Sequence, residues 1–181
     1  MSRIPQLLEG WTVLVVDDEE DSLDVANRLL TKAGAVVLAA SNGQEALSLL
    51  HGHKPDCILS DLSMPEMDGW LLMHELNTHR ATESIPVIAL TAHAMPGDRQ
   101  RAIEAGFINY ITKPLDARKF IMQLVAILVD IPQTGERLQA KVLQMQPDTQ
   151  SEDKTEPNRF PAPQNVTSDD TNVSPAANPS S

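Results

Sequence analysis

Acidic residues directly follow two short apolar segments of the sequence. Asp17 and Asp18 open the run DDEED after TVLVV, and Asp61 follows CILS. Two later apolar segments lead to Thr91 and to Lys113. Carboxylates held a few ångströms apart repel one another unless a proton or a bound cation relieves the charge. If the fold brings these five residues together, they can bind a hard cation and neutralise a phosphoryl group as it transfers.

The elements that must position these residues follow from the spacing of apolar residues. Short β-rich segments alternate with segments of helical spacing, which predicts an α/β domain of five strands and five helices. We expect the strands at 11–16, 36–39, 57–60, 87–90 and 107–111. This alternation predicts a flavodoxin-like, doubly wound parallel sheet of order 2-1-3-4-5. Sites in such sheets lie beyond the carboxyl ends of the strands, here between the first and third.

Some polar residues predict where helices begin. Ser41 with Gln44 can form a capping box for the second helix. Asp68 is expected to cap the third helix and Asp116 the fifth. Gly69 is expected to shape the loop after Asp61, a structural role rather than a chemical one.

Four segments resemble, in order and spacing, the motifs of response-regulator receiver domains, the fold of the bacterial chemotaxis regulator. They are VLVVDDEED, ILSDLSMPEMDGW, VIALTAHAM and YITKPLD. The resemblance covers residues 11–130 and implies a stand-alone receiver of a two-component system. Such a protein accepts a phosphoryl group from a histidine kinase or phosphotransfer protein and then switches partner binding. It is a signalling module rather than an enzyme, because it catalyses only its own phosphorylation and dephosphorylation.

The resemblance also implies which residues hold the phosphoryl group and the metal. Asp61 would be the phosphoacceptor that forms an aspartyl-phosphate. Asp18, Asp61 and the backbone carbonyl of Ser63 would hold Mg²⁺, and Asp17 would act on the metal through water. Lys113 would pair with the phosphoryl oxygens, and the bond from Lys113 to the following proline would be cis.

Further residues are expected to transmit or time the phosphorylated state. By resemblance, Thr91 would close on the phosphoryl group, and Tyr110 would be the aromatic switch on the face built by the fourth helix, fifth strand and fifth helix. Ser63 and His93 would border the phosphoryl group, so both are candidates for tuning its lifetime.

The same strand order and acidic residues also occur in proteins of other function. A flavodoxin-like FMN protein shares the strand order, but DDEED would repel the FMN phosphate unless a metal intervenes. A phosphohydrolase with an aspartate nucleophile normally carries that nucleophile after the first strand, whereas Asp61 follows the third. A relay intermediate or a constitutive adaptor would keep the same fold.

Charge and composition limit the partners and the domain boundaries. The 181 residues carry 25 acidic and 14 basic side chains, and the net charge of −11 argues against direct contact with nucleic acid. No segment is typical of a signal peptide or a membrane span, so we expect a cytoplasmic protein without a membrane partner.

Composition changes near Pro132, since seven of the 13 prolines lie in 132–181. We therefore expect an N-terminal extension at 1–10, the receiver domain at 11–130, and a Pro-rich, acidic, largely disordered tail at 131–181 that is dispensable for phosphotransfer. Leu138, Val142 and Met145 have helical spacing, which allows a short helix over 136–146.

Overall fold

A computed structural model describes residues 6–92 and 98–144, and within them it contains one parallel sheet of five strands. The strand order is β2-β1-β3-β4-β5, as predicted. Each strand lies within two residues of its expected position. The strands are β1 (Thr12–Val16), β2 (Val36–Ala40), β3 (Cys57–Asp61), β4 (Val87–Thr91) and β5 (Asn109–Thr112).

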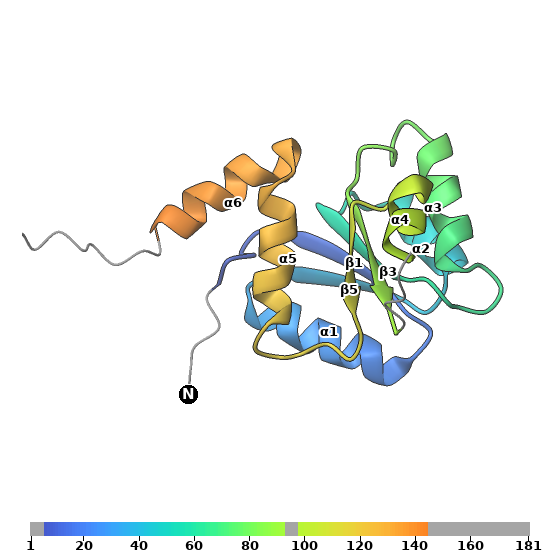
Figure 1. Ribbon diagram of the computed structural model, residues 1–181, viewed down its shortest axis with the longest axis horizontal. Coiled ribbons are helices and arrows are strands. Elements are labelled where there is room, and N and C mark those ends of the chain that lie inside the picture. The colour runs from blue at the N-terminus through green and yellow to red at the C-terminus, as the bar shows by residue number, and fades with distance from the viewer. Residues whose placement is uncertain (1–5, 93–97, 145–181) are drawn as a thin grey trace, which may run out of the picture. The chain divides into compact units, whose positions relative to one another are not determined.

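Helices cover both faces of the sheet (Figure 1). α1 (Glu20–Lys32) and α5 (Phe120–Val129) lie on one face. α2 (Gly43–Leu50), α3 (Gly69–Thr78) and α4 (Asp98–Ala105) lie on the other. A further helix, α6 (Pro132–Gln144), follows α5. None of the described helices is both long and apolar enough to cross a membrane.

The sheet is covered on both faces, so successive residues of one strand enter different cores. In β1, Val13 and Val15 pack in the core shared with α1 and α5, whereas Leu14 and Val16 pack in the core shared with α2 and α3. Continuous apolar strands such as TVLVV are typical of a parallel sheet covered on both sides. The polar residues that follow the strands are thereby confined to the edge of the sheet.

The domain does not end at residue 130, because α6 contributes to the core. Leu138 of α6 is fully buried in the cluster that contains Ile131 and Trp11. Thr134 Oγ1 donates a hydrogen bond of 2.6 Å to the carbonyl oxygen of Leu128 in α5. The expected tail is therefore wrong for residues 131–144. Its prolines indicated disorder, but Pro132 occupies the first position of a helix, where proline is well tolerated. The rest of the expected tail, 145–181, lies outside the described residues.

The N-terminal segment is also more than an extension. Leu7 and Leu8 are buried in the same cluster as Leu138, and the amide of Leu8 donates to the carbonyl of Ala33 after α1. Arg137 of α6 joins this region. Its guanidinium lies 4.8 Å from the ring centroid of Trp11, and its Nη1 is 2.6 Å from Asp56 Oδ1. The N-terminal segment and α6 thus close one end of the core together.

Two predicted helix starts are corrected. The cap of α2 is Asn42, whose Oδ1 accepts from the amide of Glu45, while the carboxylate of Glu45 accepts from the amide of Ser41 at 2.7 Å. Capping is thus shifted one residue from the expected pair. Asp116 accepts from two amides of the turn before α5 rather than capping the helix itself, which begins at Phe120. Asp68 caps α3 as expected.

Candidate functional site

Strand register brings Asp17 and Asp61 side by side at the carboxyl edge of the sheet. Val16 of β1 pairs with Ser60 of β3, and each aspartate is the next residue of its chain segment. Both aspartates are buried, with 1% and 6% of their surface exposed. The carboxyl edge between β1 and β3, where the sequence predicts a site, therefore carries two buried aspartates.

The remaining residues at this edge come from β4 and β5. Thr91 ends β4 and pairs with Thr112, so Lys113 leaves the sheet at the same level. The backbone amide of Lys113 donates to the carbonyl of Thr91 at 2.8 Å, and the peptide bond between Lys113 and Pro114 is cis, as expected. Thr91 is 8% exposed.

The ammonium of Lys113 lies among three carboxylates. Its Nζ is 2.7 Å from Asp17 Oδ2, 2.9 Å from Asp61 Oδ2 and 3.5 Å from Glu19 Oε2. The contact with Asp17 Oδ2 is an ion pair without the directional geometry of a hydrogen bond, and that oxygen is buried. One ammonium therefore faces more negative charge than it neutralises.

Burial and charge shift the pKa values of this cluster. Burial raises the pKa of Asp17 above its usual value, although contact with Lys113 opposes that shift. Burial alone would lower the pKa of Lys113, but Asp17 and Asp61 outweigh it and raise that pKa above its usual value. The ammonium is consequently charged throughout the physiological range. A hydrogen bond from Ser22, followed by the charge of Lys113, lowers the pKa of Glu19.

Three aspartates could hold a metal ion. Asp17, Asp18 and Asp61 each offer a carboxylate oxygen, and these oxygens lie within 4.8 Å of one another. The donor set consists of oxygen only, which suits a hard cation such as Mg²⁺. Asp18 is exposed, whereas the other two are buried. The uncompensated negative charge around one ammonium also favours a cation here, so the residues present fit the expected metal.

The loop after β3 orients Asp61. The amide of Ser63 donates to Asp61 Oδ1 at 3.2 Å, so the two carboxylate oxygens have different partners. Glu66 adopts a positive φ of 64°, and the amide of Met67 donates to the carbonyl of Pro65 at 2.8 Å, which closes a tight turn. His93, the other predicted lifetime residue, lies outside the described residues.

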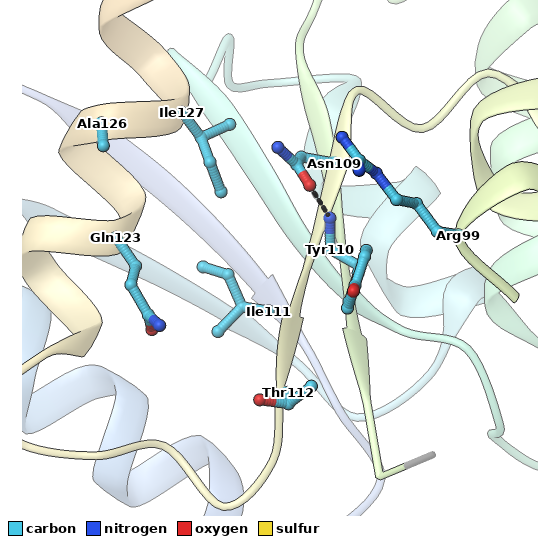
Figure 2. A pocket seen from close by; sticks show the side chains of 8 residues that line it. All are labelled: Arg99, Asn109, Tyr110, Ile111, Thr112, Gln123, Ala126 and Ile127. Atoms are coloured by element: carbon cyan, nitrogen blue, oxygen red, sulfur yellow. Dashed lines mark hydrogen bonds between the residues drawn. The ribbon is translucent and has the colours of Figure 1, made fainter. Parts of the chain in front are cut away.

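Tyr110 lines a groove of about 450 Å³ on the α4, β5 and α5 side of the domain (Figure 2), and none of the carboxylates near Lys113 lines that groove. Arg99 of α4 lines one side and Ile127 of α5 the other, and residues 109–112 of β5 lie between them. Tyr110 is half-buried. The structure thus places the predicted switch residue on a concave surface and on β5, the strand that Lys113 directly follows.

Sequence reasoning missed Glu19 as a contact of Lys113. The run DDEED contains five consecutive acidic residues, so the sequence does not indicate which of them contacts Lys113. The structure distinguishes them, because α1 begins at Glu20 and Glu19 lies just before it. The adjacency of Glu19 to the Asp17–Asp18 pair was the available indication.

Gly69 should be intolerant of any side chain. A Cβ at this position would lie 2.2 Å from the carbonyl oxygen of Asp61 and 2.9 Å from Leu62 Cα, both backbone atoms. We expect Gly69→Ala to lower the free energy of unfolding by about 3 kcal/mol, the upper range of overpacking costs. Denaturant unfolding measures this. Gly52→Ala is the control, because a Cβ at Gly52 would meet no other atom within 4 Å. Equal stability of the two variants would contradict the close approach.

Comparison with known proteins identifies the family of the domain. Residues 13–125 match the model of the response regulator receiver domain. The chain is 36% identical over 119 residues to the polar-differentiation response regulator DivK of Brucella anthropi, and the match spans 66% of this chain and 97% of DivK.

Solved structures show the same fold. The chemotaxis response regulator CheY4 of Vibrio cholerae is 27% identical, with a TM-score of 0.62 over 65% of this chain and 98% of CheY4. The receiver domain of a sensor histidine kinase of Pseudomonas aeruginosa is 29% identical, with a TM-score of 0.59 over 65% of this chain and 96% of that one. That structure has a magnesium ion coordinated in its active-site cleft.

Proposed function

Since the chain belongs to the response regulator receiver domain family, we propose that it accepts a phosphoryl group on Asp61 from a histidine kinase or phosphotransfer protein. The observation that carries the proposal is the 2.9 Å contact between Lys113 Nζ and Asp61 Oδ2. An ammonium at this distance can follow negative charge as it develops on an incoming phosphoryl group. Incubation with acetyl phosphate and Mg²⁺ tests the proposal, because intact-protein mass spectrometry should detect one added phosphoryl group.

The transfer requires few protein groups. A carboxylate oxygen of Asp61 attacks the phosphorus of a phosphohistidine, so a P–O bond forms as the P–N bond breaks. The departing imidazole nitrogen keeps the electron pair of that bond and takes a proton from solvent. Lys113 compensates the charge on the transferred oxygens. Transfer onward to a second histidine would make the protein a relay intermediate, whereas the charged cluster has no use in a constitutive adaptor.

We also propose that the site binds Mg²⁺. Asp18, Asp61 and the carbonyl of Ser63 would hold it, with Asp17 acting through water. When bound, the cation neutralises charge on the phosphoryl oxygens. The all-oxygen donor set and its excess negative charge support this assignment.

Asp18→Ala should remove most of the stabilisation that Mg²⁺ provides. Binding at a concentration about 100 times Kd stabilises a protein by about 2.7 kcal/mol, and the wild-type melting temperature should rise accordingly. The variant loses an exposed ligand without opening a cavity, so its own fold should be intact. Thermal melts with and without Mg²⁺ measure the effect.

Asp21→Ala is the matched control for Asp18→Ala. It removes one charge from the same acidic run but from the first turn of α1. The control should keep the Mg²⁺-induced rise in melting temperature. If Asp18→Ala keeps it as well, Asp18 is not a ligand.

We further propose that the phosphorylated state is read at the groove around Tyr110. Thr91 would close on the phosphoryl group, and Tyr110 would change its packing in response. Two packings of one side chain, biased by a local change of charge, are sufficient for a population switch. Ser63 and His93 would tune the phosphoryl lifetime. The backbone amide of Lys113, the residue after β5, donates a hydrogen bond to the carbonyl of Thr91, which supports this route.

A further inference from the structure

Glu19 is the third carboxylate on the ammonium of Lys113, and it differs from the other two in exposure. Its side chain is 66% exposed, against 1% for Asp17 and 9% for Asp61. It therefore lies at the solvent-exposed rim of the site. Its Oε2 is 3.5 Å from Lys113 Nζ.

The position of the Glu19 carboxylate is restrained from two directions. Ser22 Oγ donates to Glu19 Oε2 at 2.9 Å, the same oxygen that faces Lys113. The backbone amide of Glu19 donates to Asp17 Oδ1 at 3.0 Å, which ties the residue to the buried acid. An exposed glutamate without such contacts would sample many rotamers. Here the negative charge is held beside the ammonium.

We propose that Glu19, oriented by Ser22, is a positioning residue that acts through Lys113 to lower the affinity of the site for a phosphoryl group. The inference rests on the proposed function, since it concerns the same ammonium and the same phosphoacceptor. A phosphoryl group on Asp61 must draw Lys113 toward its own oxygens. Glu19 competes for that ammonium and repels the added negative charge, whereas it attracts a cation.

The two ligands of the site should therefore respond to Glu19 in opposite directions. Neutralising Glu19 removes repulsion from an anion and attraction from a cation. Loss of a merely structural contact would weaken both ligands together or neither. For charges near a protein surface we expect about a three- to tenfold change in anion affinity and a smaller change for the cation. Both changes should shrink as ionic strength rises, because salt screens exposed charges.

The experiment uses the full chain and two probes. The affinity for Mg²⁺ alone is measured first, by isothermal titration. The affinity for beryllofluoride, a mimic of the phosphoryl group, is then measured at saturating Mg²⁺ so that weaker metal binding does not mask the result. Wild type is compared with Glu19→Gln, which keeps the size of the side chain and removes its charge. Glu20→Gln is the control, because it makes the same change of net charge in the first turn of α1.

Glu19→Gln should bind beryllofluoride about three- to tenfold more tightly than wild type and bind Mg²⁺ less tightly. Glu20→Gln should differ from wild type by much less. Ser22→Ala should shift both affinities in the same directions as Glu19→Gln but by less, since it frees the carboxylate without removing it. The double variant should match Glu19→Gln alone.

If Glu19→Gln binds beryllofluoride as tightly as wild type or less tightly, the inference is overturned. The proposed function still holds in that case, provided that the wild-type protein binds beryllofluoride. An equal gain in Glu20→Gln also overturns the inference, because the effect would then come from net charge alone. If wild type binds no beryllofluoride at saturating Mg²⁺, the proposed function fails, and the inference fails with it.

Discussion

Asp61→Asn should abolish phosphoryl labelling of the full chain by acetyl phosphate or by a phosphorylated kinase. An amide is a poor nucleophile, and its neutral oxygen is a poorer ligand for Mg²⁺ than a carboxylate. The substitution also removes one of the two buried carboxylates that face Lys113. We expect labelling to fall to background, because no other described carboxylate has the same combination of burial, ammonium contact and backbone donor from the loop after β3.

Intact-protein mass spectrometry, followed by peptide mapping, measures the loss of labelling. Asp130→Asn is the control, since Asp130 is an exposed carboxylate at the end of α5 and should leave labelling unchanged. Circular dichroism should show that Asp61→Asn is folded, because the change is isosteric. A base-labile phosphoryl group on another residue of Asp61→Asn would show that the phosphoacceptor is wrongly assigned.

Loss of α6 should destabilise the whole domain. Leu138 lies beyond the family match at 13–125, yet its side chain is fully buried in the cluster with Leu8 and Trp11. We expect Leu138→Ala to lower the free energy of unfolding by about 2–5 kcal/mol, as other buried leucines do. A chain that ends after Ile131 should lose more, because Arg137 and its contacts with Trp11 and Asp56 are removed as well.

Denaturant unfolding and the melting temperature measure these losses. Gln139→Ala is the control for Leu138→Ala, because Gln139 is the exposed neighbour on the same helix. A chain that ends after Pro147 should keep the stability of the full chain, since it retains all of α6. Wild-type stability of the chain that ends after Ile131 would restore the expectation that everything beyond Asp130 is dispensable.

The buried charges of the site lower the folding stability of the domain. Asp17 is buried with a raised pKa, so its ionised form costs folding free energy that a neutral side chain would not. Lys113 offsets part of this cost with one ammonium shared among several carboxylates. Such an arrangement has little value for packing but leaves a net negative site that a cation can complete.

The sequence alone determined the sheet order and the edge of the sheet at which the candidate site residues meet, for a simple geometric reason. In a parallel sheet every strand ends at the same edge, so the residue that follows each strand is placed by the order of the strands. Asp17, Asp61, Thr91 and Lys113 all end or follow strands, and the register of β1 with β3 and of β4 with β5 brings them to that edge.

Tertiary structure decided the features that depend on which side chains meet. The spacing around Leu138 allowed a helix, but only packing against Leu8 and Trp11 makes that helix part of the core. Glu19 belongs to a run of similar acidic residues, and only the position of the Lys113 side chain shows that Glu19 contacts its ammonium. Local periodicity determines which face of an element is apolar, whereas contacts between residues distant in sequence depend on how the elements pack.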